Sequence, residues 1–193
     1  TDVDYGYTTV AQTGTAGTTH NWPRGHTLGG SSSINAMVYL RGHRNDFDQW
    51  SESGCPGWDY ESVLPYFRRM ESVCGADPDY RGTSGPMRPA PVSPAEANPM
   101  SRVFLDAAEA AGFGSTTDFN GATAEGAGWH DLSITGRQRQ SAATAYLRPV
   151  LGRRNLAVLT RSRVRNLRFS GNRCVGVDFD DAGHPKTVHA GRE

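Results

Sequence analysis

The sequence lacks any long apolar run and any segment that resembles a leader peptide. No stretch approaches about 18 consecutive apolar residues, so no membrane-spanning helix is expected. Residues 1–10 contain neither a basic segment nor the apolar segment typical of a signal peptide, and we therefore expect a cytoplasmic protein. The chain also begins without Met, which indicates a mature form, a cleavage product or a piece of something longer.

The sequence carries no excess of either charge. Lys and Arg total 20, Asp and Glu total 20, and this balance argues against a nucleic-acid partner. Residues 137–173 nevertheless hold ten arginines and no acidic residue. Arg161, Arg163 and Arg165 alternate and would share one face of a strand. We favour a solvated sheet face over a phosphate-binding surface for this stretch.

Residues typical of metal sites and disulfide frameworks are scarce. The three cysteines, Cys55, Cys74 and Cys174, show no metal-type spacing and are expected to be reduced and inert. A Cys55–Cys74 bridge stays open as an unsupported alternative. The six histidines form no HxxxH pair and none has a cysteine at ligand spacing, so no metal site is expected.

A complete catalytic set is also missing from the sequence. There is no GxSxG motif of the kind that presents a nucleophilic serine. Asp46 and Asp48 lie near Arg41 and Arg44 in sequence, which predicts local ion pairs more readily than paired catalytic carboxylates. The residues alone therefore leave one candidate for a ligand-binding loop and no catalytic group.

What is present indicates a loop-rich α+β protein with a thin core. Hydrophobic residues make up 36% of the chain and glycine occurs 23 times. A proline-rich loop is expected over 75–98, whereas the polar segment 41–57 predicts no element of its own. The expected helices are a short buried one starting near Ile34, one over 58–70 with Pro65 as a possible restart, one over 100–111 capped by Asn98, and one over 141–147 ending before Pro149.

The last fifth of the chain predicts a β-meander. Four short strands are expected at 156–160, 164–169, 174–179 and 186–189, with turns between them, and a further strand is expected earlier at 129–135.

The strongest local feature is the segment 23–35, Pro-Arg-Gly-His-Thr-Leu-Gly-Gly-Ser-Ser-Ser-Ile-Asn. Glycines allow close backbone approach to a ligand, and a helix start favours an anion such as phosphate. A tight turn before a buried helix explains the same residues and is favoured on physical grounds alone. The segment is neither a Walker A loop nor a G-x-G-x-x-G motif.

Segment 23–48 resembles the first signature of the glucose–methanol–choline (GMC) oxidoreductases, flavin enzymes that act on alcohols. Further similar motifs follow in the family's order along nearly the whole chain, and the likeness is greatest to the choline-dehydrogenase-like bacterial branch. The motifs are Leu28–Asn35, Tyr39, Arg41-Gly42, Asp46–Asp48, Gly57-Trp58, Leu64–Phe67, Asp118–Gly121, Ser141–Ala143, Tyr146–Pro149, Arg154–Leu156 and Gly176-Val177.

The resemblance implies an α+β chain that forms part of a two-domain GMC fold. Residues 1–50 would be a segment of the FAD-binding domain with a flavin-contacting Gly-Gly-Ser loop. Residues 51–150 would be mainly substrate-domain and loop segments, and 151–193 a β-meander returning to the FAD domain. The implied reaction is oxidation of a small-molecule alcohol by deprotonation at a His and hydride transfer to flavin.

The resemblance also implies where FAD would bind. Gly29, Gly30 and Ser31 correspond to contacts near the flavin diphosphate and ribityl chain. Asn35, Ala36, Met37 and Val38 correspond to the stretch along the isoalloxazine ring, and Val164 to the position whose backbone pairs with the adenine. Some members attach flavin through a His one residue before this Asn; here that residue is Ile34, so noncovalent binding is expected.

Several family features are absent or altered. His26 stands where Lys, Arg or Asn is usual, and Ala36 where Gly is usual. The N-terminal G-x-G-x-x-G, the second signature and the C-terminal catalytic His are missing, so the chain resembles an internal slice. Companion segments or chains would have to supply them, and the chain alone is expected to be inactive. The alternatives are a non-enzymatic Gly-loop or structural fragment, or a GMC-fold lyase.

Overall fold

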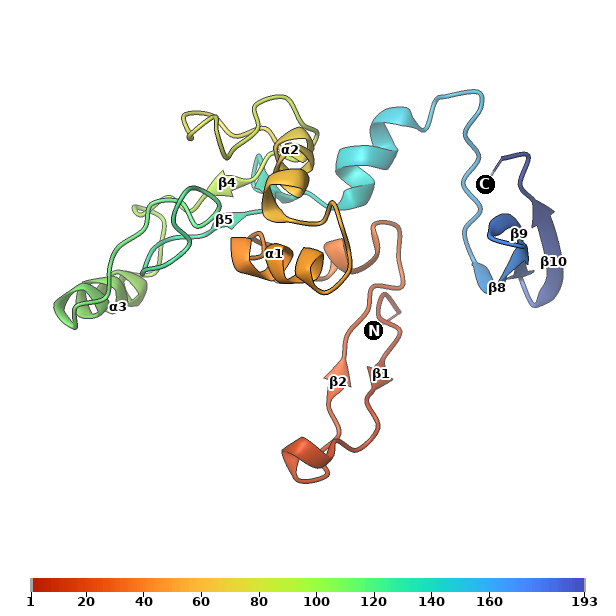
Figure 1. Cartoon of the computed structure of the whole chain (residues 1–193), viewed down its shortest axis with the longest axis horizontal. Coiled ribbons are helices and arrows are strands. Elements are labelled where there is room, and N and C mark those ends of the chain that lie inside the picture. The colour runs from red at the N-terminus through yellow and green to blue at the C-terminus, as the bar shows by residue number, and fades with distance from the viewer. Residues whose placement is uncertain (1, 193) are drawn as a thin grey trace. The chain divides into compact units, whose positions relative to one another are not determined.

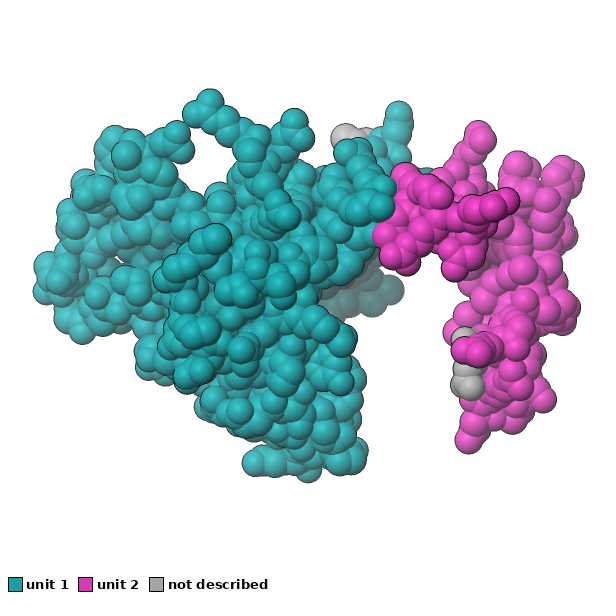
Figure 2. Space-filling model, turned by 90° about the horizontal axis from the view of Figure 1, so that it is seen from above, with its two compact units in different colours: residues 1–149 teal, residues 150–193 magenta. Residues whose placement is uncertain are grey.

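The computed structural model describes residues 2–192 and confirms the α+β class, with three α-helices and short antiparallel strands (Figure 1). The chain divides into two compact units, residues 1–149 and 150–193 (Figure 2). The named strands form four small sheets, all with antiparallel neighbours. No helix of the described residues is long and apolar enough to cross a membrane.

The first unit opens with a hairpin. Strands β1 (Tyr7–Thr8) and β2 (Asn21–Trp22) pair with Tyr7 opposite Trp22. A 3-10 turn, Thr13–Thr15, lies at its end, and both strands are exposed.

Helices α1 (Arg44–Glu52) and α2 (Tyr60–Met70) form the apolar core of this unit. Phe47, Tyr60 and Leu64 are buried together, with Val63 and Phe67 packed against them. Positions 60, 63, 64 and 67 recur at helical spacing, so one stripe of α2 faces α1. The core therefore rests on a few aromatic contacts, such as Phe47 against Phe67 at 5.5 Å between ring centroids.

Helix α1 was not expected from the sequence. Backbone N–H groups at the starts of α1 and α2 bind the two acidic residues that were predicted to form ion pairs. Asp46 accepts a hydrogen bond from the backbone N–H of His43, and the His43 ring accepts one from Asn45. Asp48 accepts from the backbone N–H of Tyr60. The prediction that Asp46 and Asp48 pair with nearby arginines is therefore wrong.

Helix α2 confirms the prediction for 58–70, with Asp59 as its N-cap. The helix continues through Pro65 without a restart, although proline removes one main-chain donor. Helix α3 (Pro99–Ala110) likewise confirms its prediction, because Asn98 caps it and Pro99 occupies the first turn. No residue of α3 is buried, and Val103 and Phe104 are exposed.

Short strands pair three segments of the first unit that are far apart in the sequence. Strands β3 (Val38–Tyr39), β5 (Asp131–Leu132) and β4 (Ala90–Pro91) form one sheet, with β5 in the middle. The strand expected over 129–135 is broken into β5 and β6 (Ile134–Thr135). Strand β6 pairs with β7 (Gln138–Arg139) across a two-residue turn, an element not anticipated from the sequence.

The structure corrects two predicted helices, the first in its existence and the second only in where it ends. The predicted buried helix from Ile34 does not form: a 3-10 helix, Gly30–Ser33, ends there and the chain becomes extended, with Leu28, Val38 and Leu40 exposed. The helical prediction for 141–147 is confirmed as a π-helical turn, Ala143–Leu147. It does not stop before proline, because a 3-10 turn, Arg148–Val150, follows directly.

The second unit contains a three-stranded meander rather than the expected four strands. Strands β8 (Ser162–Ser170), β9 (Arg173–Asp181) and β10 (His184–His189) lie in the order β10-β9-β8. Residues 156–160 are exposed and form no strand, because they lack a pairing partner in this sheet. A register shift follows Val164, and Arg165 and Arg168 form ion pairs with Asp180 and Asp178, as a solvated sheet face would.

Candidate functional site

The glycine pair predicted to contact flavin forms a left-handed turn at the start of the 3-10 helix. Gly29 has φ 91° and Gly30 has φ 56°, values that L side chains rarely adopt. A Cβ on Gly29 would lie 2.5 Å from Ser33 Oγ and 3.1 Å from Ser141 Oγ. A Cβ on Gly30 would meet nothing within 4 Å. Gly29 is thus needed for internal packing, while the Gly30 backbone stays open to a ligand.

Serine side chains fix the shape of this turn. Ser32 Oγ donates to the Gly29 carbonyl at 2.5 Å and accepts from the Ala142 backbone N–H at 2.8 Å. Ser33 Oγ donates to the Leu28 carbonyl at 2.8 Å. Ser31 Oγ accepts from the Gly25 N–H at 3.2 Å. The three consecutive serines therefore satisfy main-chain groups within and beyond the turn, a function that the sequence pattern did not reveal.

Asn35 and Met37 form a second constrained turn directly after the 3-10 helix. Met37 has φ 65°, and its backbone N–H donates to Asn35 Oδ1 at 3.0 Å. This side-chain-to-backbone bond is characteristic of an Asx turn. The Met37 carbonyl accepts from both the N–H and the hydroxyl of Ser133, at 2.8 and 3.0 Å. The positive φ of Met37 is thus stabilised by hydrogen bonds at both its N–H and its carbonyl group. Strained backbone of this kind is common at functional sites.

Arg139 joins this loop from strand β7 and was not identified in the sequence. Its Nη1 donates to the Asn35 carbonyl and to Asn35 Oδ1, each at 2.8 Å, and lies 3.4 Å from the Ser32 carbonyl. Arg139 lies in the arginine-rich stretch 137–173, for which the sequence favours a solvated sheet face. Its contact with Asn35 could not be predicted from spacing, because the two residues are 104 positions apart.

The structure brings seven of the eight predicted cofactor contacts together in the first unit: Gly29, Gly30, Ser31, Asn35, Ala36, Met37 and Val38. Asn35, Ala36 and Val38 are exposed, so their side chains are available to a ligand. Val164 belongs to the second unit, where it lies opposite Phe179 on the edge strand β8 and is exposed. One edge of β8 has no neighbour within this sheet.

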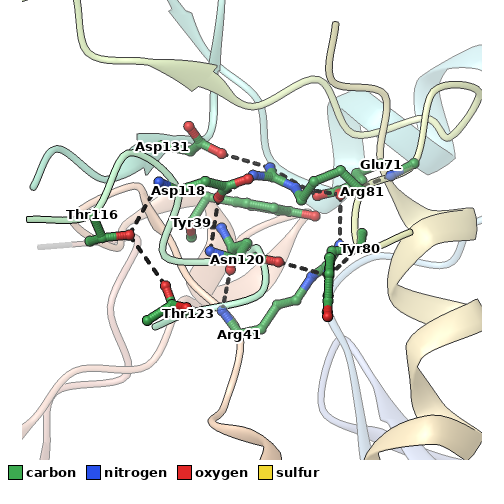
Figure 3. A network of polar contacts seen from close by, with 11 residues as sticks. Tyr39, Arg41, Glu71, Tyr80, Arg81, Thr116, Asp118, Asn120, Thr123 and Asp131 are labelled. Atoms are coloured by element: carbon green, nitrogen blue, oxygen red, sulfur yellow. Dashed lines mark hydrogen bonds and ion pairs between the residues drawn. The ribbon is translucent and has the colours of Figure 1, made fainter. Parts of the chain in front are cut away.

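A buried ionic network forms a second polar cluster in the first unit, from side chains that are far apart in sequence (Figure 3). The Glu71 carboxylate is fully buried. It accepts from Arg41 Nη2 at 2.6 Å and from Arg81 Nε at 2.7 Å, and the Gly82 N–H donates to it at 3.1 Å. These charge-assisted hydrogen bonds offset the loss of hydration that burial imposes on the carboxylate.

Arg81 extends the network to two more acidic residues. Its Nη1 donates to Asp118 and its Nη2 to Asp131, each at 2.6 Å. Burial opposes the charge of Arg81, but its bonds to Glu71, Asp118 and Asp131 outweigh this and raise the pKa of Arg81. All the formal charges here are paired. The network therefore joins segments that are distant in sequence and offers no unpaired carboxylate as a base.

Tyr39 and Asn120 complete this region. Asn120 accepts from the Arg41 backbone N–H at 2.8 Å and donates to the Tyr39 carbonyl at 3.0 Å. The Tyr39 hydroxyl is buried and has no hydrogen-bond partner among residues 2–192. Burial and the negative charge of Glu71 raise the pKa of Tyr39. This phenol therefore stays neutral and is not a proton acceptor at ordinary pH.

Within the part of the chain that the structure describes, no three His, Cys, Asp or Glu side chains come together as a metal site. Cys55 and Cys74 are free and exposed, so the alternative of a bridge between them is not realised.

Residues 7–193 match the family described as GMC oxidoreductase. The chain is 43% identical over 188 residues to a protein named choline dehydrogenase, mitochondrial, from Homo sapiens, covering 97% of this chain and 31% of the relative. It is also 43% identical over 191 residues to an oxygen-dependent choline dehydrogenase of Brucella anthropi, covering 98% and 34%. The chain thus spans about a third of the length of these curated relatives.

Solved structures show the same fold. A pyridoxine 4-oxidase from Mesorbium loti superposes with a TM-score of 0.89 at 35% identity, over 97% of this chain and 37% of that one. An FAD-dependent oxidoreductase from Chaetomium thermophilum gives a TM-score of 0.86 at 29% identity, over 98% and 35%.

Proposed function

Because the chain belongs to the GMC oxidoreductase family, we propose that it is an internal third of an FAD-dependent enzyme that oxidises an alcohol. It would supply the flavin-side loop and much of the substrate domain. The observation that carries this proposal is the pair of constrained turns at Gly29-Gly30 and Asn35–Met37, which lie within the family's signature and present exposed groups.

The residues of this loop fit one side of a flavin cofactor. Gly30 leaves its backbone open, Asn35 presents an exposed amide, and Val38 adds an exposed apolar side chain. Open backbone near a phosphate chain and apolar contact along an aromatic ring are what FAD requires. Gly29, Gly30 and Ser31 would contact the diphosphate and ribityl chain, and Asn35 to Val38 the ring.

Two further assignments belong to the same proposal. The exposed edge of β8 supports Val164 as the position whose backbone pairs with the adenine, since an edge strand offers main-chain donors and acceptors. Ile34 has no nucleophilic nitrogen, which supports noncovalent attachment. We assign residues 1–50 and 151–193 to the FAD-binding domain and 51–150 mainly to the substrate domain.

Bound FAD would accept hydride from the carbon that carries the hydroxyl group. This chain's own residues would bind and orient the cofactor and hold a hydrogen-bond donor, the Asn35 amide, at the loop. The proton acceptor, a His in the family, would come from companion segments or chains. The chain by itself would be inactive.

Choline is the first alcohol to test, because relatives at 43% identity carry the name choline dehydrogenase. The complete protein that contains this sequence should be purified and its flavin content measured. Oxidation of choline, benzyl alcohol and pyridoxine should then be followed with oxygen and with an artificial electron acceptor. Flavin at about one per chain and alcohol-dependent acceptor reduction are the expected results.

The same experiment separates the alternatives. Purified complete protein without flavin would contradict the proposed function and favour a non-enzymatic structural fragment. Bound flavin with conversion of an alcohol-containing substrate, but without reduction of any acceptor, would instead indicate a lyase.

A further inference from the structure

Arg139 reaches the Asn35 loop because a tight hairpin positions it there. Gly136 and Arg137 connect β6 to β7 and both have positive φ, 56° and 63°. Two consecutive residues of this kind form the turn type whose twist suits a two-residue hairpin. Gln140, the next residue, binds the opposite segment: its side chain accepts from the Arg88 N–H and donates to the Pro86 carbonyl. The hairpin is thus fixed, and with it the base of the Arg139 side chain.

The charge of Arg139 is not compensated by any carboxylate of the described residues. Three arginines between residues 2 and 192 are not exposed: Arg41, Arg81 and Arg139. Arg41 and Arg81 bind the buried Glu71. Arg139 binds only oxygens of Ser32 and Asn35. A partly buried cation is costly without an anion, and such a group is typically retained where it performs a task.

The contact also determines which way the Asn35 amide faces. Oδ1 accepts from the Met37 N–H at 3.0 Å and from Arg139 Nη1 at 2.8 Å. With both donors at the oxygen, the amide NH₂ group must face away from them. Within residues 2–192 this NH₂ group has no acceptor, and Asn35 is exposed. Its two donors are therefore presented outward by an arrangement that the Met37 N–H and Arg139 enforce together.

We infer that Arg139 is a positioning residue for the flavin-side loop. It holds Asn35 so that the amide NH₂ donates to the bound cofactor, and it places an uncompensated positive charge beside that contact. This inference rests on the proposed function, since it concerns how the same loop acts on flavin. A nearby donor and a positive charge favour an electron-rich ring, so they raise the flavin reduction potential.

The test compares variants of the complete protein by turnover per bound flavin, flavin content, flavin midpoint potential and thermal unfolding. Arg139→Met should lower turnover per flavin roughly tenfold or more, because a charge-assisted hydrogen bond is lost. Its midpoint potential should become more negative. Arg139→Lys should recover part of both effects, since the charge remains. Arg88→Met is the matched control: it removes an exposed arginine side chain near the hairpin and should resemble the parent.

A double-mutant cycle shows whether Arg139 acts through Asn35. Arg139→Met should slow the Asn35→Ala protein by clearly less than it slows the parent, because the contact with the Asn35 side chain is already lost and only the effect of the positive charge remains to be removed. Multiplied effects would overturn the inference. Unchanged turnover per flavin in Arg139→Met, with only lower thermal stability, would overturn it too and leave a purely structural contact.

Asn35→Asp tests the same point if the Arg139 variants do not fold. The carboxylate keeps the contact with Arg139 but lacks the outward NH₂, so turnover per flavin should fall about as far as in Asn35→Ala while the protein remains stable. Parental turnover in Asn35→Asp would overturn the inference. A parent protein that binds no flavin would instead refute the proposed function, and the inference with it.

Discussion

Glu71 and Arg81 form a buried ion pair, 2.7 Å from Arg81 Nε to Glu71 Oε1, with side chains that are 2% exposed or less. The pair joins the end of α2 to the loop ten residues later, and through Asp118 and Asp131 to two further segments. Few apolar side chains are buried in this chain, so the network ties together segments that the small aromatic core does not reach.

Glu71→Gln should therefore lower the free energy of unfolding of the complete protein by about 3–5 kcal/mol, since it leaves the buried Arg41 guanidinium without an anion and removes one of the three carboxylates that bind Arg81. Denaturant unfolding measures this. Glu61→Gln is the control: its pair with Arg44 is exposed and is worth about 0–1 kcal/mol. Equal effects of the two substitutions would contradict the central position of Glu71.

The buried hydroxyl of Tyr39 gives a prediction about pH. Its pKa in the folded state is raised above the ordinary value of 10.0, chiefly by burial and then by Glu71. The unfolded chain therefore loses this proton first, and stability falls as the pH rises above about 10. Tyr39→Phe should reduce that alkaline loss and be close to neutral at pH 7, because the hydroxyl has no partner among residues 2–192.

Urea unfolding at pH 7 and pH 10.5 checks this prediction. Tyr66→Phe, which changes an exposed ring, serves as the control and should leave the alkaline loss unchanged. If the two variants showed the same dependence on pH, Tyr39 would not be the group responsible.

The two glycines of the loop should respond differently to alanine. Gly29→Ala places a Cβ 2.5 Å from Ser33 Oγ at φ 91°, so both thermal stability and flavin content should fall. Gly30→Ala adds a Cβ in open space at φ 56°, which costs about 1 kcal/mol of backbone strain. Its main effect should be weaker flavin binding, because the new methyl group occupies the side left open to the ligand.

Flavin-to-protein ratio and melting temperature, measured on the same preparations, separate these effects. A Gly30→Ala protein with the parent's flavin affinity would remove that backbone from the cofactor site.

The adenine assignment predicts a contrast at Val164. Val164→Ile should keep flavin, since the proposed contact is through the backbone, whereas Val164→Pro removes the N–H and should lose it. Leu167→Pro, on the same strand, controls for general damage to β8. If both proline variants lost flavin equally, Val164 would be an ordinary strand residue.

Noncovalent attachment is tested on the parent in the same series. Flavin should pass into the supernatant when the protein is precipitated with acid. Colour retained by the precipitate would contradict noncovalent binding and the reasoning from Ile34.

The sequence predicted features that depend on neighbouring residues. Helix α2 with its Asp59 cap, helix α3 with Asn98 and Pro99, and most of the meander follow from local capping, spacing and turn residues. The family motif also identified the loop around Gly29 and Asn35, which the physical pattern alone left as a turn or a ligand site.

Tertiary structure decided what depends on partners distant in sequence. Asp46 and Asp48 could have paired with nearby arginines, but they accept hydrogen bonds from the backbone N–H groups of His43 and Tyr60 instead. Residues 156–160 have strand composition and no strand to pair with. Arg139 meets Asn35 only because the β6–β7 hairpin places it there, across 104 residues. Such contacts leave no periodic trace in a sequence, since each depends on where two separate segments meet in space.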